Sequence, residues 1–270
     1  LAGLMNYARV TDRRLADLRV VVNGAGAAGI RIADMCKAAG VRDLVMCDSK
    51  GTLNDTRTDL NDHKRRHAVR TPAGTLAEAV RGAHVFVGVS AAGVLSGDDA
   101  SRMADFPAIF AMANPDPEID PAAAAAAFGD KPFVMATGRS DYPNQINNVL
   151  GFPFIFRGAL DVMATNINEE MKMAAARALA DLAKQPVPEY VLQAYDVEKL
   201  EFGIDYIIPT PVDLRLFEFE SAAVAQAAMD TGVAKKPIAD MDAYRASLRE
   251  RIKKSRQRLD AFVQSYPQIF

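Results

Sequence analysis

The sequence lacks several features that mark secreted, membrane and nucleic-acid-binding proteins. Its 270 residues include only two cysteines, Cys36 and Cys47, whose spacing fits neither a disulfide framework nor a zinc site. We therefore expect buried, reduced thiols and a cytoplasmic protein. No apolar run reaches the roughly 18 residues that a membrane span requires, so we expect no membrane insertion. The net charge of −2 at pH 7 also argues against nucleic acid as a partner.

What the sequence does contain is typical of a globular protein with one large domain or two modest ones. Half of its residues are hydrophobic and 24% are charged, a balance that supports a sizeable core. The chain begins at Leu1 and not at Met, and the apolar residues among the first eight form one face, as at the end of a helix. We therefore expect residues 1–18 to be a leading helix from a longer protein.

The most informative feature is a strand–glycine–helix–strand pattern near the N-terminus. The β-branched run Val20–Val22 has the composition of a buried parallel strand, and it leads into a complete G-x-G-x-x-G at 24–29. A helical pattern follows, and a second apolar run, Leu44–Cys47, then ends on Asp48. A lone G-x-G-x-x-G is a weak signal, but these elements in this order predict a dinucleotide site.

Each glycine of this motif has its own predicted task. Gly24 permits a tight turn, Gly26 lets the backbone approach a pyrophosphate, and Gly29 lets the helix pack closely on the strand. The start of the helix offers free N–H groups and the positive end of its dipole to that pyrophosphate. Asp48 is placed to accept hydrogen bonds from an adenosine ribose. The alternative is a glycine-rich turn without a ligand.

Basic residues after the second strand bear on the choice between NAD and NADP. Lys50 or Arg65 would meet a 2′-phosphate, whereas the carboxylate of Asp48 would repel it, so the sequence leaves the choice between NAD and NADP open.

His63 and His67 have a metal-ligand spacing if they are helical, but no acidic or sulfur partner completes such a site. We expect a solvated surface helix here and no metal site in this chain.

Three further apolar runs, at 85–89, 108–112 and 133–136, each end in a loop of small or polar residues. Helical patterns alternate with these runs, which is typical of an α/β fold with a doubly wound parallel sheet, Rossmann-like. Ligands bind outside the carboxyl ends of the strands in such sheets, so we expect these loops to form the site. The nucleotide-binding domain is expected to span 19–160.

Past this domain the strands stop and helical patterns take over. Residues 167–184 predict a long amphipathic helix, which Asn168 is expected to cap. Further helices are expected near 219–229 and 243–262. We therefore expect residues 161–270 to form additional C-terminal helices, an extension packed on the Rossmann-like domain.

Several segments carry motifs that are specific in combination. They are VVVNGAGAAGI and VMCDSKG within 20–51, GVSAAGVL at 88–95, FAMANPDPE at 110–118, ATGRSDYPNQINNVLGFPFIFRGALD at 136–161, NEEMK at 168–172, YIIPTP at 206–211 and KPIAD at 236–240. Together they resemble the C-terminal, NAD(P)-binding half of bacterial malic enzymes. KPIAD is similar to the hybrid type, in which a phosphotransacetylase-like domain follows. The resemblance covers the chain from about Leu1 to Tyr244.

The resemblance implies an enzyme that oxidatively decarboxylates malate to pyruvate and CO2 with NAD or NADP and with Mg2+ or Mn2+. Hydride leaves C2 of malate for the nicotinamide, and the metal then polarises the new ketone so that the β-carboxylate departs. A general acid finally protonates the enolate. Malate and pyruvate are the implied small-molecule partners, and the implied assembly is a homo-oligomer, a dimer or larger.

The resemblance also assigns binding residues through their places in these motifs. Asn114 and Asn148 would bind the malate carboxylate beside the nicotinamide, with Asn147 next to the cofactor. On the residues alone, Asn114 before a proline also suits a turn, and the asparagine pair also suits a helix cap. The cofactor-binding residues expected are Gly24, Ala25, Gly26, Ala27, Ala28, Gly29, Asp48, Ser49, Lys50, Ser90, Ala91, Asn114 and Asn147.

Catalytic and metal-binding residues are expected to lie outside this chain. In the family a tyrosine, a lysine and the acidic metal ligands come from an earlier domain, and their motifs precede the position of Leu1. Lys172 and Tyr142 have no motif support as substitutes. We therefore expect these residues alone to bind a nucleotide without turning over malate.

Two other functions stay open at this point. One is a non-catalytic module for nucleotide binding or oligomerisation; a tyrosine, a lysine and an acidic metal cluster upstream would favour the enzyme instead. The other is a different Rossmann dehydrogenase, of the amino-acid or folate type. Substrate profiling with malate against glutamate would separate these dehydrogenases.

Overall fold

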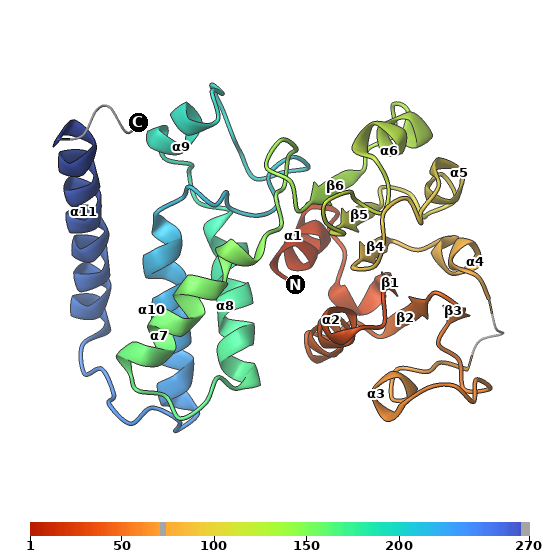
Figure 1. Cartoon of the computed structure of the whole chain (residues 1–270), viewed down its shortest axis with the longest axis horizontal. Coiled ribbons are helices and arrows are strands. Elements are labelled where there is room, and N and C mark those ends of the chain that lie inside the picture. The colour runs from red at the N-terminus through yellow and green to blue at the C-terminus, as the bar shows by residue number, and fades with distance from the viewer. Residues whose placement is uncertain (71–73, 266–270) are drawn as a thin grey trace. The chain divides into compact units, whose positions relative to one another are not determined.

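The computed structural model describes residues 1–70 and 74–265, and the chain divides into two units (Figure 1). The first unit is built from residues up to 147 and from residues 201–208. The second unit is built from residues 148–200 and the described residues from 209 onward. The domain boundaries expected near residues 18 and 160 stay a prediction.

The first unit contains a six-stranded sheet. Its strands are β1 (Arg19–Asn23), β2 (Asp43–Asp48), β3 (Gly51–Thr52), β4 (Val85–Gly88), β5 (Ala108–Ala111) and β6 (Val134–Thr137). Their order is β3-β2-β1-β4-β5-β6; β3 pairs antiparallel with β2, and the other pairs are parallel. The chain moves outward from β1 in both directions, so the switch point at which ligands bind lies between β1 and β4. The predicted doubly wound, Rossmann-like α/β fold is confirmed.

Helices cover both faces of this sheet. Within the described residues they are α1 (Ala2–Val10), α2 (Ala27–Ala38), α3 (Asp62–Arg65), α4 (Leu76–Val80), α5 (Gly97–Ala100) and α6 (Pro121–Phe128). Residues of α1 and α2 belong to the core on one face, and residues of α4, α5 and α6 belong to the core on the other (Figure 1).

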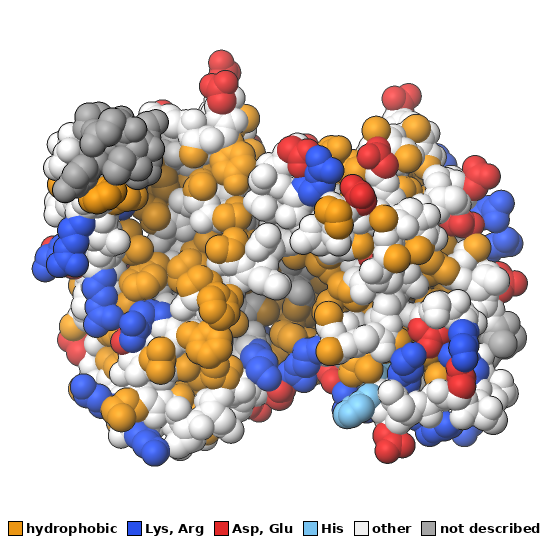
Figure 2. All heavy atoms as spheres, in the orientation of Figure 1, with side chains coloured by type: hydrophobic (Ala, Val, Ile, Leu, Met, Phe, Trp, Pro, Cys, Tyr) orange, Lys and Arg blue, Asp and Glu red, His pale blue; other side chains and the backbone are white. Residues whose placement is uncertain are grey.

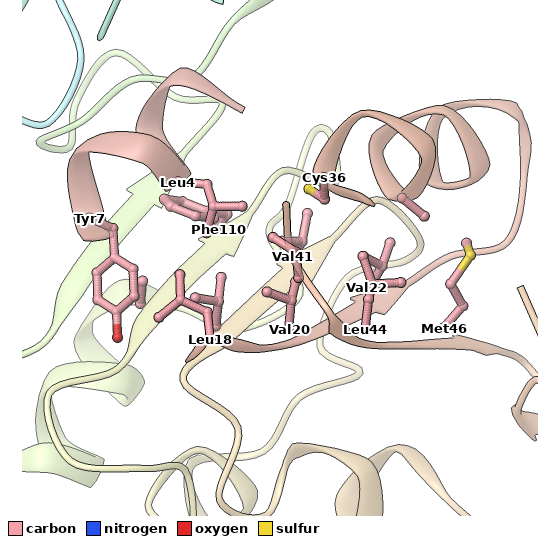
Figure 3. Close-up of a cluster of buried hydrophobic side chains, with 14 of the residues drawn as sticks. Leu4, Tyr7, Leu18, Val20, Val22, Cys36, Val41, Leu44, Met46 and Phe110 are labelled. Carbon is pink, nitrogen blue, oxygen red and sulfur yellow. The ribbon is translucent and has the colours of Figure 1, made fainter. Parts of the chain in front are cut away.

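Alternate residues of each central strand enter different cores. Val20 and Val22 lie in one cluster and Val21 in the other, as the two-residue period of a strand requires. Burial on both faces is the reason why these strands are continuous apolar runs in the sequence. Figure 3 shows the first cluster, in which Leu4 from α1 and Cys36 from α2 pack against the strands.

The second unit is helical, as predicted for this part of the chain. Its described helices are α7 (Phe152–Asp161), α8 (Glu169–Leu182), α9 (Glu189–Ala194), α10 (Arg215–Asp230) and α11 (Met241–Ser265). Helix α10 packs against α7, α8 and α11 (Figure 1). The side chain of Asn168 accepts a hydrogen bond from the Met171 N–H at 3.0 Å, so the predicted cap of α8 is confirmed. None of the helices in the described residues has the length and apolar character needed to cross a membrane.

Candidate dinucleotide site

The loop between β1 and α2 has the close contacts that its glycines allow. Gly24 has φ +117°, a left-handed conformation, and its N–H donates to the Cys47 carbonyl at 2.9 Å. A Cβ at Gly29 would lie 1.7 Å from the Gly24 carbonyl oxygen, so no side chain fits there. A Cβ at Gly26 would meet no atom within 4 Å. The loop is therefore tightly fixed at two glycines and open at the third.

Helix α2 begins at this open glycine with unsatisfied backbone donors. Gly26 is its N-cap and supplies no side-chain cap, and the first turn, Ala27–Ile30, carries no charge. Gly26, Ala27 and Ala28 are exposed. The first N–H groups of a helix lack intrahelical partners and lie at the positive end of its dipole. This turn can therefore bind an anion such as a diphosphate.

A cleft of about 730 Å³ opens at the carboxyl ends of β1, β2 and β4. Its volume lies within the range of roughly 300–1,000 Å³ typical of small-molecule sites. The lining residues all belong to the first unit. They are Asn23, Gly24, Ala25, Gly26, Asp48, Ser49, Lys50, Gly51, Lys64, Thr75, Leu76, Ser90, Ala91 and Val94.

Asp48 lies at the β2 end of the cleft and is held in a cluster of basic groups. Arg57 donates to both of its carboxylate oxygens, at 2.8 and 3.1 Å, and Lys64 Nζ donates at 2.8 Å. The Lys50 N–H donates at 3.0 Å. Burial raises the pKa of Asp48, but the hydrogen bonds from Arg57 and Lys64 outweigh it and lower that pKa to about 2. The Asp48 carboxylate is therefore ionised, and both of its oxygens accept hydrogen bonds from Arg57, Lys64 or the Lys50 N–H.

The sequence predicts Lys50 or Arg65 as a phosphate ligand, but no pattern in it indicates Arg57 or Lys64. Strand β3 pairs antiparallel with β2, so the chain turns back after Asp48. This turn places Arg57 beside Asp48. Arg65 is exposed and donates to the Leu60 carbonyl at 3.0 Å, outside this cluster. Figure 2 shows side chains of both charges gathered where α3 lies in Figure 1.

The loop after β4 is fixed by Glu118, a residue for which the sequence carries no functional signal. Glu118 is fully buried and accepts hydrogen bonds from the Ser90 N–H at 2.8 Å and from the Ala113 N–H at 2.9 Å. The Ser90 hydroxyl accepts a hydrogen bond from Asn23 at 2.8 Å. This carboxylate therefore holds the loops after β4 and β5 together, with Ser90 at the edge of the cleft.

A family model described as the malic enzyme NAD-binding domain matches residues 1–196. The chain belongs to this family.

Malic enzymes from several organisms are similar to this chain. The NADP-dependent malic enzyme of Halomonas elongata is 55% identical over 238 residues, which are 87% of this chain and 56% of that protein. The NADP-dependent malic enzyme of Rhizobium meliloti is 53% identical over 253 residues, 93% of this chain and 33% of that protein. The crystal structure of Entamoeba histolytica malic enzyme has a TM-score of 0.86 at 32% identity, covering all of this chain and 54% of that one. The chain therefore spans about half, or less, of the proteins that it matches.

Eight of the expected cofactor residues line the cleft of this malic enzyme domain. They are Gly24, Ala25, Gly26, Asp48, Ser49, Lys50, Ser90 and Ala91. Ala27 lines a neighbouring cleft of about 550 Å³ together with Gly26. Gly29 is buried below the loop.

The asparagines expected at the substrate lie elsewhere in the malic enzyme chain. Asn114 is exposed after β5, Asn147 is exposed at the end of the first unit, and Asn148 belongs to the second unit. None of these three described residues lines the 730 Å³ cleft, and their roles stay a prediction. Asn144 of the same motif is buried, where it accepts from the Ile207 N–H at 2.8 Å.

The two histidines do not share the solvated helix that their spacing predicts. Helix α3 ends at Arg65, and His63 is exposed, but His67 is only 2% exposed. His67 lies 3.1 Å from Asp34 and 3.1 Å from Lys37, both on α2, and burial lowers its pKa. The expectation is therefore wrong for His67, because contacts with α2 bury it.

Within the described residues, no group of three or more His, Cys, Asp or Glu side chains is arranged to hold a metal.

Proposed function

We propose that this chain is the dinucleotide-binding half of an enzyme that converts malate, with NAD or NADP, to pyruvate and CO2. One observation carries the proposal: in a chain of the malic enzyme family, an open glycine and an uncapped helix start face a cleft large enough for a nucleotide. The malate chemistry rests on the family and on the names of its relatives.

The residues of this chain bind and orient the cofactor. The N–H groups at the start of α2, including those of Ala27 and Ala28, bind the diphosphate. Ser49 and Lys50 lie at the adenosine ribose, and Ser90 and Ala91 flank the nucleotide on the side of β4. When bound, the nicotinamide supplies the acceptor for the hydride from C2 of malate.

Asparagine side chains orient malate without adding charge. Asn114 and Asn148 hydrogen-bond the substrate carboxylate, and Asn147 lies next to the nicotinamide. An amide positions a carboxylate as a neutral donor. The catalytic tyrosine and lysine and the ligands of Mg2+ or Mn2+ come from outside this chain, so the chain alone binds nucleotide and does not turn over malate.

The proposal also covers the partners, the assembly and the cellular compartment of the intact protein. Malate and pyruvate are its small-molecule partners, and it works as a homo-oligomer in the cytoplasm. The two cysteines are free and buried, which supports a reducing compartment.

Calorimetric titration of this chain with NADP+ and NAD+ tests the proposal. Gly26→Ala should fold normally, because its Cβ meets no protein atom within 4 Å, but it should weaken nucleotide binding about tenfold by filling the space of the diphosphate. Gly97→Ala in α5 is the matched control, since its Cβ would make ordinary contacts at 3.6 Å with residues of α6. The absence of binding of either nucleotide to the unaltered chain would overturn the proposal.

A further inference from the structure

His67 is the residue that anchors the α3 segment, residues 61–70, to helix α2. It is 2% exposed, whereas every other residue of this segment is exposed or half-buried. On one side of its ring Nδ1 lies 3.1 Å from Lys37 Nζ, and on the other side Nε2 lies 3.1 Å from Asp34 Oδ1. Both of these residues belong to α2. The imidazole therefore lies between a cation and a carboxylate.

This arrangement requires a neutral ring with its hydrogen on Nε2. The ammonium group of Lys37 is a donor only, so Nδ1 is the acceptor and the hydrogen on Nε2 faces Asp34. A second proton on Nδ1 would place an N–H and a full positive charge against that ammonium group. The position of His67 on α2 therefore depends on its protonation state.

The charged groups around the ring are mostly positive. On α2 they are Arg31, Asp34 and Lys37, and the α3 segment contributes Arg66, which donates to Asp34 at 2.7 Å. Burial, together with the charges of Lys37 and Arg66, lowers the pKa of His67 from the ordinary 6.5, although the Asp34 carboxylate acts in the opposite direction. In a segment released into water the pKa returns to its ordinary value. Acid therefore favours the released segment.

We propose that His67 is an acid-sensitive latch, which holds the α3 segment on α2 while its ring is neutral and releases the segment when its ring is protonated. Lys64 lies on this segment, lines the 730 Å³ cleft and donates to Asp48 at 2.8 Å. Release therefore loosens one wall of the cleft. The effect of release on a bound nucleotide rests on the proposed function, whereas the release itself does not.

The direction of the pH dependence follows from the protonation of the held and the released segment. Well above pH 6.5 the ring is neutral in both, so the latch is fully effective. As the pH falls below 6.5, the released segment takes up a proton first, and the equilibrium shifts toward release by at most about tenfold per pH unit. Between pH 7.5 and pH 5.5 we expect the opening equilibrium of the α3 segment to rise roughly fivefold to tenfold.

Hydrogen–deuterium exchange of the whole chain at pH 7.5 and pH 5.5, corrected for the intrinsic effect of pH on amide exchange, measures this opening at residues 61–70. His67→Gln places a neutral amide at this position and should reduce the pH effect to within about twofold. His63→Gln is the matched control, because it removes an exposed histidine from the same helix, and it should leave the effect unchanged. Equal opening of the unaltered chain at both pH values would overturn the inference, and so would a full pH effect in His67→Gln.

A second experiment distinguishes the latch from a His67→Gln variant whose segment is simply released at every pH. NMR of the histidine rings in the unaltered chain should show His67 protonating only below pH 6.5, and protonation at or above that pH would overturn the inference. Lys37→Met removes the cation that faces Nδ1. It should raise the pH at which His67 protonates and reduce the acid-induced opening to less than about half. An unchanged titration of His67 in Lys37→Met would contradict the latch.

Discussion

The carboxylate of Glu118 occupies the space that a side chain at position 88 would need. A Cβ on Gly88, the last residue of β4, would lie 2.3 Å from the carboxyl carbon of Glu118 and 2.6 Å from both of its oxygens. The same oxygens accept the backbone N–H groups of Ser90 and Ala113. The absence of a side chain at Gly88 therefore allows one carboxylate to fix two loops at the candidate site.

Gly88→Ala should destabilise the chain, because the methyl group must displace the buried carboxylate from its two backbone donors. Overpacking and the loss of hydrogen bonds to a charged group together predict a loss of at least about 2 kcal/mol. Urea unfolding followed by circular dichroism measures this effect. Gly97→Ala, with contacts at 3.6 Å, should change stability by less than about 0.5 kcal/mol. Equal stabilities for the two variants would show that position 88 tolerates a side chain.

Glu118→Gln should keep the shape of the side chain but lose one of its two acceptor oxygens. One backbone N–H, at Ser90 or Ala113, would then face an amide donor, a loss of about 1–3 kcal/mol. Asp120→Asn is the matched control, since Asp120 caps α6 and asparagine caps a helix equally well. The same unfolding experiment compares the two. A fully stable Glu118→Gln variant would mean that the carboxylate does not hold the loops.

The second unit should lose stability as the pH rises. Glu220 on α10 is fully buried, and within the described residues neither of its oxygens has a hydrogen-bond partner. Burial raises its pKa from the ordinary 4.5 to about 9. The folded chain therefore holds this proton more tightly than the unfolded chain, so the stability from this group is fully present below pH 4.5 and is lost progressively up to pH 9. The loss by pH 7 is about 3 kcal/mol, at roughly 1.4 kcal/mol per pH unit.

Unfolding free energies measured between pH 5 and pH 9 check this dependence. Glu220→Gln should remove most of the slope, because the amide does not ionise. Glu198→Gln, at an exposed position of the same unit, should leave the slope unchanged. A slope that persists in Glu220→Gln would assign the pH dependence to other groups.

Local patterns account for the parts of the structure that the sequence predicts. The run Val20–Val22 and the glycines at 24–29 specify a strand, a turn and a helix start through composition and spacing alone. Asn168 caps α8 because its side chain reaches only three residues along the chain. Contacts of this kind lie within one segment, so the sequence contains the whole signal.

The residues that the sequence does not predict depend on contacts between distant segments. Arg57 donates to Asp48 because β3 pairs antiparallel with β2 and brings the following residues back toward the end of β2. A strand of two residues is too short to show a hydrophobic pattern in the sequence. Glu118 matters because it accepts from Ser90, 28 residues earlier. His67 is buried against α2, although its neighbours along the chain are charged. Charge runs usually face water, and here the tertiary contact overrides that tendency.

A crystal structure of this chain with NADP+ tests the central claim most directly. We predict that the diphosphate oxygens lie about 3 Å from the N–H groups of Ala27 and Ala28, above the open side of Gly26. A diphosphate bound elsewhere on the chain, or a cleft without nucleotide at a saturating concentration of NADP+, would contradict the account.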